Sequence, residues 1–402
     1  MDLANQQPPE GDDVVPAPVT KYEKIIESPD DSKGSLTFGI EIEFVVPILR
    51  SGVPDPFPSD RRPVFKYPDY SNASGLIFYE LRKVCDIPFR LDTNDSYYEP
   101  HRKVVRYDTW RIVRDPSVKY KGTRGEYSWA GREITSEVFK SDNPQHYTEQ
   151  ITKACRALRQ LRVHLNQTTS LHVHVGLGDE PFSLLTIKKV IALILVADAM
   201  LLGLHHPARL DSPYCKLVSR CSSLGRWTSP LSQAQKESMR KPITASMARF
   251  IPDITATTDQ VLQETESLEE LARVMNDPDY YGYFRGTVSF ARFLPEDGIG
   301  GNTQTIEFRQ MEGCLDPDHI IHWAKVCMAI VDFARLAEPE KYKDLMEKLM
   351  VEEIPFSVFD LLLYLGLEKE EKFFRGKVKR YESNVDFYEG EGSGGLFVPE
   401  MK

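Results

Sequence analysis

The sequence lacks a hydrophobic run long enough to cross a membrane. Its longest run, residues 190–204, is interrupted by Asp198 and falls short of the ~20 residues that a membrane-spanning helix needs. We predict that this run forms a buried helix instead. The opening residues MDLANQQPPEGDD also lack the basic start and the apolar core of a signal peptide. We therefore expect a cytoplasmic protein that has no membrane partner.

Basic residues are fewer than acidic residues in this chain. The chain has 50 lysine and arginine residues against 60 aspartate and glutamate residues, which gives a net charge of −10. Proteins that bind nucleic acids depend largely on lysine and arginine contacts to phosphates, so we expect no nucleic-acid partner. A local cluster of arginine and histidine could still bind a small anion despite the overall negative charge.

Paired cysteines are also lacking. The six cysteines have no CxxC spacing, so the sequence indicates neither a zinc knuckle nor a disulfide framework. The composition, 41% hydrophobic and 27% charged, is that of a soluble globular protein with ample material for a core. Residues 1–33 are rich in Pro, Asp and Gln, and we expect a disordered tail there. Residues 384–402, rich in Gly and Glu, are expected to form a loose tail.

What the chain does have is a set of strictly alternating stretches. Residues 37–46, TFGIEIEFVV, place Glu41 and Glu43 on one side and large apolar residues on the other. Successive side chains of a strand point to opposite faces, so the two carboxylates share a face. Two adjacent carboxylates repel each other unless something positive lies between them. A metal ion would supply that charge.

Two later stretches repeat this pattern. SLHVHVG places His172 and His174 opposite three apolar residues, and TIEFRQ places Glu307 and Arg309 opposite two. Each stretch alone is a weak signal, and the last pair could be a surface ion pair of little consequence. Together they predict one sheet with an apolar back and a front that carries metal-binding and phosphate-binding side chains.

Other segments add candidates. The short strand predicted at residues 132–138 carries Glu133, and an alternating run YGYFRGTVSFARF carries Arg285. The long polar segment 207–252 contains Arg220 and is expected to be a functional loop or lid. Helices are predicted at 71–85, from Asn143-Pro144 through Leu165, at 180–205, at 268–275, from Asp316-Pro317 through Ala334, at 341–350 and at 356–365.

The predicted strands do not alternate one for one with helices, and their faces are half polar. This pattern favours an α+β fold with an antiparallel (mixed) curved sheet, a polar catalytic face and helices packed on the apolar face. Glutamates with one or two imidazoles suit Mg²⁺ or Mn²⁺. Arginines on the same face suit a phosphoryl group or a substrate carboxylate. A sheet face that can bind metal ions, a carboxylate and a phosphate is typical of an enzyme that activates a carboxylic acid with ATP.

Five motifs also follow one another in the order of a known family: FGIEIEF, WRIVRDPS, GREITSEVF, SLHVHVG and TIEFRQMEGCLDP. The chain resembles the amidoligases, within the carboxylate–amine ligase superfamily of glutamine synthetase and glutamate–cysteine ligase. The resemblance runs from about residue 38 to about residue 323. It implies a glutamine synthetase-like antiparallel sheet that forms a funnel for ATP and two or three divalent ions. The catalytic domain would span residues 34–338, followed by a helical extension over 339–383.

The resemblance also implies that two metal ions share five ligands: Glu41, Glu43, Glu133, His172 and Glu307. Glu43 and Glu133 would hold the metal nearest the amino-acid substrate. The other three would hold the metal nearest the nucleotide phosphates.

Further roles concern anions. His174 would contact a phosphate, and Arg309 the phosphoryl group or the substrate carboxylate. Arg285 and Asp115 match more loosely, and Arg220 could have a phosphate role.

The chain departs from the family's usual residues at three positions. It has Ser170 where a Gly commonly precedes the LHVH run, Ser289 where an Asn is common, and Pro116 where a Gly is usual. None of these departures removes a predicted ligand, but they leave the placement of the substrate open.

The predicted activity is that of an ATP-dependent carboxylate–amine ligase. A carboxylate would attack the γ-phosphate of ATP, and an amine would then displace phosphate from the acyl phosphate. The sequence does not identify the acid, which could be a small molecule or a peptide, or the amine. It does not indicate the oligomeric state either. Alternatives are a phosphotransferase like the guanidino kinases, a metal-dependent hydrolase, and a non-catalytic binding module on the same fold.

Overall fold

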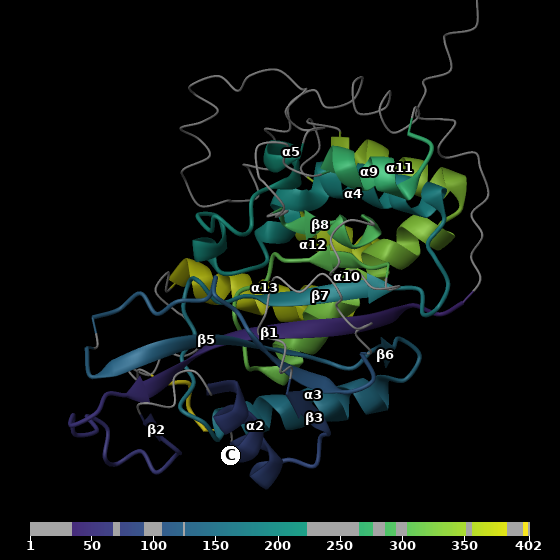
Figure 1. The fold of residues 1–402 in the computed structure, drawn as a ribbon. Helices are drawn as coiled ribbons and strands as arrows, with labels where there is room; N and C mark the ends of the chain where they lie inside the picture. Colours follow the sequence, from purple (N-terminus) through teal and green to yellow (C-terminus); the bar gives the residue numbers. More distant parts are fainter. Residues whose placement is uncertain are drawn as a thin grey trace, which may run out of the picture.

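The structure is a computed structural model that describes residues 34–66, 73–91, 107–123, 125–222, 265–275, 286–294, 304–350, 356–383 and 397–400. It is a mixed α+β fold, as predicted, in which the long strands cross the middle of the molecule (Figure 1). Its strands are β1 (Thr37–Leu49), β2 (Phe65–Lys66), β3 (Phe89–Leu91), β4 (Trp110–Arg114), β5 (Tyr127–Thr135), β6 (Phe139–Lys140), β7 (Leu171–Gly176), β8 (Val288–Ser289) and β9 (Ile306–Phe308).

The sheet is open and mixed. Its strand order is β3-β4-β5-β1-β7-β9-β8, and β2 and β6 also pair with β1. The β1–β5, β1–β7, β4–β5, β7–β9 and β8–β9 pairs are antiparallel, whereas β1–β2 and β3–β4 are parallel. The three alternating motifs of the sequence thus lie on neighbouring strands, β1, β7 and β9, although they are far apart in the chain.

Helices lie above, below and behind the long strands in the view of Figure 1. They are α2 (Ala73–Val84), α3 (Pro144–Arg159), α4 (Leu184–Leu202), α5 (Val218–Cys221), α9 (Leu268–Met275), α10 (Pro317–Leu336), α11 (Pro339–Met350), α12 (Val358–Tyr364) and α13 (Glu368–Ser383), with 3-10 turns η2 (Pro207–Arg209) and η4 (Ala291–Phe293). The predicted starts at Asn143 and Asp316 are confirmed, because each side chain accepts a hydrogen bond from a first-turn backbone N–H.

Two predicted helix boundaries are wrong. The apolar spacing predicted α3 to continue through Leu165, but α3 ends at Arg159. His164 instead exchanges backbone hydrogen bonds with Val45 of β1, which holds this segment extended while Leu165 stays buried. The helix expected from Glu180 begins at Leu184 instead, because the Ser183 hydroxyl accepts from its first turn.

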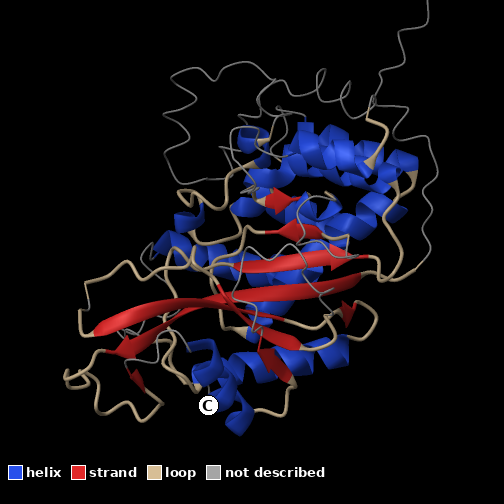
Figure 2. Ribbon diagram, in the orientation of Figure 1, coloured by secondary structure: helices blue, strands red, loops and turns tan. Residues whose placement is uncertain are grey.

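The core lies on the apolar face of the sheet. Ile40, Ile42 and Phe44 of β1 are at most 1% exposed, as the alternation predicted. Behind them, α10 packs against β7 and brings Trp323 edge-on to Phe308, with ring centroids 6.5 Å apart. Figure 2 shows helices behind the long strands.

A short segment far along the chain is anchored beside the end of β1. Within the tail expected to be loose, Phe397 and Val398 are buried. The Val398 backbone N–H donates to the Val163 carbonyl at 2.9 Å, and Arg62 Nη1 donates to the Val398 carbonyl at 2.6 Å. The expectation of a loose tail therefore does not extend to residues 397–400.

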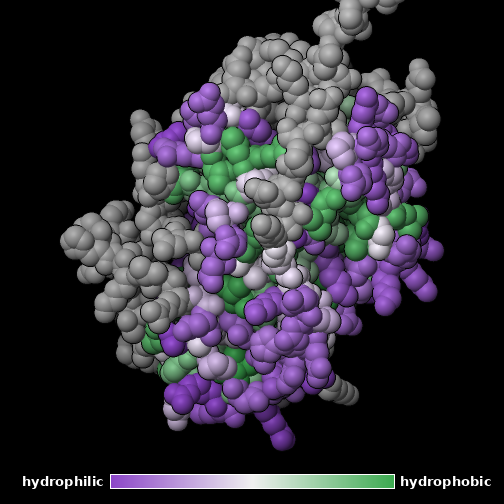
Figure 3. Space-filling view, turned by 90° about the vertical axis from the view of Figure 1, so that its right-hand side faces the viewer, coloured by the Kyte–Doolittle hydropathy of each residue, from purple (hydrophilic) through white to green (hydrophobic). Residues whose placement is uncertain are grey.

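The outer surface is mixed. On the side shown in Figure 3, hydrophilic residues cover much of the lower part, and hydrophobic residues gather above them beside residues that are not described. Across the described ranges, no helix is both long enough and apolar enough to cross a membrane.

Asp198 lies within the apolar helix α4 and is 1% exposed. Its carboxylate accepts a hydrogen bond from the Val218 backbone N–H at 2.7 Å, which fixes the start of α5. Burial raises the pKa of Asp198 from 3.8 to about 6, despite the hydrogen bonds that favour the charged form. The stability that Asp198 contributes is therefore present below its unfolded pKa and is lost as pH rises through about 6.

Asp198→Asn removes this titration and keeps an oxygen that can accept from Val218. Relative to this variant, the wild type should lose roughly 3 kcal/mol of unfolding free energy between pH 4 and pH 7.5, because two pKa units correspond to about that energy. Urea unfolding of both proteins across this range measures the difference. A difference that does not change with pH would contradict the buried, protonated carboxyl.

Candidate active site

The strand register brings the predicted site residues together. Glu43 of β1 lies directly opposite Glu133 of β5, and Glu41 lies opposite His172 of β7. His174 lies opposite Glu307 of β9. Directly opposed residues of an antiparallel pair point to the same face, so all these side chains project from one side of the sheet. The shared face that the sequence predicted is thus present.

These side chains form three overlapping groups in which one ligand atom from each member lies within 4.8 Å of the others. The groups are Glu43 with Asp115 and Glu133, Glu41 with Glu133 and His172, and Glu41 with His174 and Glu307. The first contains the pair predicted for the substrate-side metal. The third places His174, which was predicted to contact a phosphate, among possible metal ligands.

A close approach of two chain segments positions Asp115. The loop after β4 crosses β5 at Gly131, where a Cβ would overlap the carbonyl oxygens of Asp115 and Val118. Only glycine leaves this space free. The Asp115 carboxylate also accepts from the Ser117 backbone N–H at 2.7 Å, which fixes the turn. Asp115 matched the family only loosely, and the structure brings it to Glu43 and Glu133.

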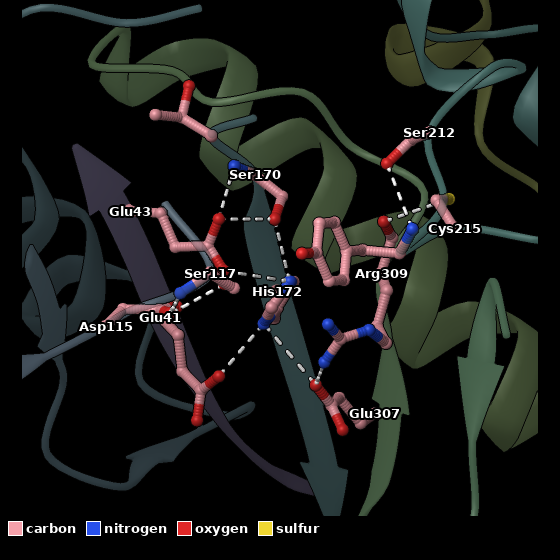
Figure 4. A network of polar contacts seen from close by, with 12 residues as sticks. Glu41, Glu43, Asp115, Ser117, Ser170, His172, Ser212, Cys215, Glu307 and Arg309 are labelled. Atoms are coloured by element: carbon pink, nitrogen blue, oxygen red, sulfur yellow. Dashed lines mark hydrogen bonds and ion pairs between the residues drawn. The ribbon is translucent and has the colours of Figure 1, made fainter. Parts of the chain in front are cut away.

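Hydrogen bonds and ion pairs join the groups into one network (Figure 4). His172 Nδ1 lies 3.0 Å from Glu41 Oε2 and 3.4 Å from Glu307 Oε1. His174 Nε2 lies 3.0 Å from Glu41 Oε1. On the other side of His172, the Ser170 hydroxyl lies 2.9 Å from Nε2.

Arg309 closes the network beside Glu307, with which its guanidinium makes an ion pair. The backbone around Arg309 is firmly held. Its carbonyl accepts from Arg209 Nη2 at 2.8 Å and from Cys215 Sγ at 3.3 Å, and its N–H donates to the Thr287 carbonyl at 2.7 Å. The ion pair is 17% and 11% exposed at its two side chains, so it is no surface pair, and that alternative is contradicted.

Burial and charge set unequal pKa values for the carboxylates. Burial, reinforced by nearby carboxylates, raises the pKa of Glu133 well above its usual range, and burial also raises the pKa of Glu43. For Glu41, His174 and His172 outweigh burial and hold the pKa well below that range. For Glu307, Arg309, His174 and His172 together outweigh burial and lower the pKa to about 2.

Negative charge exceeds positive charge in this network. Its carboxylates are Glu41, Glu43, Asp115, Glu133 and Glu307. Arg309 and Arg292, whose guanidinium lies 3.8 Å from Glu41, supply two positive charges. The difference requires protons or cations, and the raised pKa of Glu133 reflects the same need. Divalent cations with oxygen and imidazole ligands fit this set of residues.

A cavity of about 80 Å³ opens beside His174, where β1 begins and β7 ends. Its lining includes Gly39, Glu41, His174, Arg292 and Thr305. Since one water needs ~10–15 Å³ of such volume, the cavity has room for several water molecules or for part of a ligand.

Three other positions complete the comparison with the sequence. Arg285 lies outside the described residues. Arg220 is exposed on α5, and its charge interacts with that of Asp198. Arg292, by contrast, was missed: it lies in the 3-10 turn η4 and reaches Glu41. Its only sequence signal was its place at the end of the alternating run.

Glu133→Gln should stabilise the metal-free protein by on the order of 1–2 kcal/mol at neutral pH, because it removes one of the crowded carboxylates. It should also reduce the rise in melting temperature that Mn²⁺ produces, because a ligand is lost. Thermal melts with EDTA or MnCl₂ measure both effects. The control is Glu149→Gln, which breaks an exposed pair with Lys153 and should change neither by much. If Glu133→Gln were less stable than the wild type and Mn²⁺ still raised its melting temperature by the full amount, Glu133 would not be a metal ligand.

Comparison with known proteins gives one result on the family. The family model described as "Putative amidoligase enzyme" matches residues 34–331. This range contains all the strands of the sheet and every member of the three groups. A search of curated proteins finds no match. The matched range covers most of the chain, which therefore belongs to this amidoligase family.

Proposed function

We propose that this protein is an ATP-dependent carboxylate–amine ligase that uses Mg²⁺ or Mn²⁺. The family indicates a ligase. The observation that carries the rest is the meeting of five carboxylates, two histidines and two arginines on one face of the sheet. This combination can hold divalent cations and a phosphoryl group side by side, which transfer of phosphate to a carboxylate requires.

The residues divide naturally between two cation positions. Glu43, Asp115 and Glu133 would hold one cation, and Glu41 with Glu307 and the histidines would hold another. Bound cations would neutralise charge on the phosphates and align them for transfer. Because Glu41 and Glu133 also share a group with His172, the two positions adjoin each other.

Arg309 and Arg292 would bind the anionic parts of the substrates. Arg309 is largely buried, and three contacts to its backbone fix its position. A guanidinium held in this way can bind a phosphoryl group or carboxylate with two hydrogen bonds. Arg292 lines the cavity beside His174, so it would contact the part of the ligand that enters there.

The proposed reaction has two steps. A carboxylate oxygen of the acid takes the γ-phosphoryl group of ATP, and ADP leaves. The amine nitrogen then attacks the acyl carbon and loses a proton, and phosphate leaves as the amide forms. The chain's residues would contribute mainly alignment and charge neutralisation.

A screen for ADP release tests this proposal. With Mg²⁺ and ATP present, ADP and phosphate should appear in quantity only when an acid and an amine are both supplied. Pools of amino acids, peptides and amines narrow the substrate class. ADP release with a single acceptor would favour the phosphotransferase alternative. Hydrolysis of a substrate without ATP would favour the hydrolase. No nucleotide binding in the presence of Mg²⁺ would rule out the ligase.

Glu307→Gln should lower kcat by at least about 100-fold, because it removes a ligand charge and the partner of Arg309. Its thermal melt without metal should fall, because Arg309 loses its ionised partner, but the protein should still fold and unfold cooperatively. The control Glu149→Gln should keep the activity of the wild type. A collapse of the metal-free fold would instead show that Glu307 is chiefly structural.

A further inference from the structure

Ser170 lies between Glu43 and His172, which are proposed ligands of the two different cations. Its backbone N–H donates to Glu43 Oε2 at 2.8 Å, and its hydroxyl donates to the same oxygen at 2.7 Å. The hydroxyl also lies 2.9 Å from His172 Nε2, and the residue is 3% exposed. A single buried hydroxyl therefore contacts a predicted ligand of each cation (Figure 4).

The hydroxyl has one proton and two lone pairs, which limits how it can bond. Glu43 must be ionised to bind a divalent cation, so the Ser170 proton goes to Glu43. The hydroxyl oxygen can then only accept from His172. Nε2 must therefore carry a hydrogen, and in the neutral ring the free lone pair is on Nδ1.

The Nδ1 side of the ring faces two carboxylates. Nδ1 lies 3.0 Å from Glu41 Oε2 and 3.4 Å from Glu307 Oε1. A nitrogen lone pair and two carboxylate oxygens repel one another unless a cation lies among them. The tautomer with its hydrogen on Nε2, which Ser170 favours, therefore leaves Nδ1 available as a metal ligand.

We propose that Ser170 is a positioning residue that fixes His172 for binding a divalent cation through Nδ1 and restrains Glu43 for the neighbouring cation. The inference rests on the metal part of the proposed function. A metal-binding histidine commonly donates its other N–H to an oxygen, and losing that oxygen typically weakens metal binding about 10- to 100-fold. Here the same hydroxyl serves both cation positions.

The order Ser170, His172, Glu41 also resembles the nucleophile, base and carboxylate of serine hydrolases. The hydrogen bonds argue against that role. Both the N–H and the hydroxyl of Ser170 point to Glu43, so the serine proton is directed away from the imidazole that would have to accept it. The side chain is also buried.

Binding of Mn²⁺, followed by the electron paramagnetic resonance signal of free Mn²⁺, tests the proposal without turnover. Ser170→Ala should weaken binding of Mn²⁺ by about 10- to 100-fold. Ser170→Thr keeps a hydroxyl and should restore most of the affinity. Ser222→Ala is the matched control, because this buried hydroxyl donates to the Val218 carbonyl away from the three groups. It should leave Mn²⁺ binding unchanged.

Nitrogen NMR of histidine-labelled protein with Mg²⁺ supplies a second readout. The signals that His172→Gln removes should show a protonated Nε2 in the wild type, and Ser170→Ala should lose this fixed tautomer. Wild-type Mn²⁺ affinity and tautomer in Ser170→Ala would overturn the inference, even if that variant melts lower. If the wild type binds no divalent cation, the metal part of the proposed function fails as well. If cations bind as expected but no acid and amine give ADP, only the ligase assignment fails.

Discussion

The crowding of carboxylates on one face of the sheet is the constraint on which the rest of the structure depends. Buried like charges are costly, and several kcal/mol can separate a paired from an unpaired buried ion. The chain offsets part of this cost with Arg309 against Glu307 and with the histidines against Glu41. A protein that keeps such a cluster has to hold it together by other means. Here those means are the apolar face and the strand register.

Regular pairing across four strands provides that support. On the far side of the sheet, α10 packs on β7 and on Phe308 of β9, and the apolar residues of β1 belong to the same core. This packing leaves the strands little freedom to shift. A shift of one strand by one residue would turn the carboxylates of that strand toward the core, so the register is strongly specified. The backbone contacts from Arg209, Cys215 and Thr287 do the same for Arg309, which lies just beyond the end of β9.

The sequence predicted the faces of the strands well, because alternation is a local property of the chain. It could not predict the contacts that loops, turns and helix ends make with distant segments. Asp115 joins the site only because a loop crosses β5 at Gly131. A single glycine in the sequence does not predict such a crossing. Arg292 reaches the site from a 3-10 turn with no periodicity of its own. In the same way, α3 ends early because of a partner, Val45, that lies more than one hundred residues away.

The strand order also has a consequence for folding. Glu43 and Ser170 are 127 residues apart, His172 and Glu41 are 131 apart, and Arg62 reaches across 336 residues to Val398. Contacts of such long range form slowly, because the intervening chain must first be ordered. During that time β1, a 13-residue strand with a hydrophobic face, would be open to pairing with other chains. Glu41 and Glu43 place charge in the middle of this strand and so protect it from aggregation until its own partners arrive.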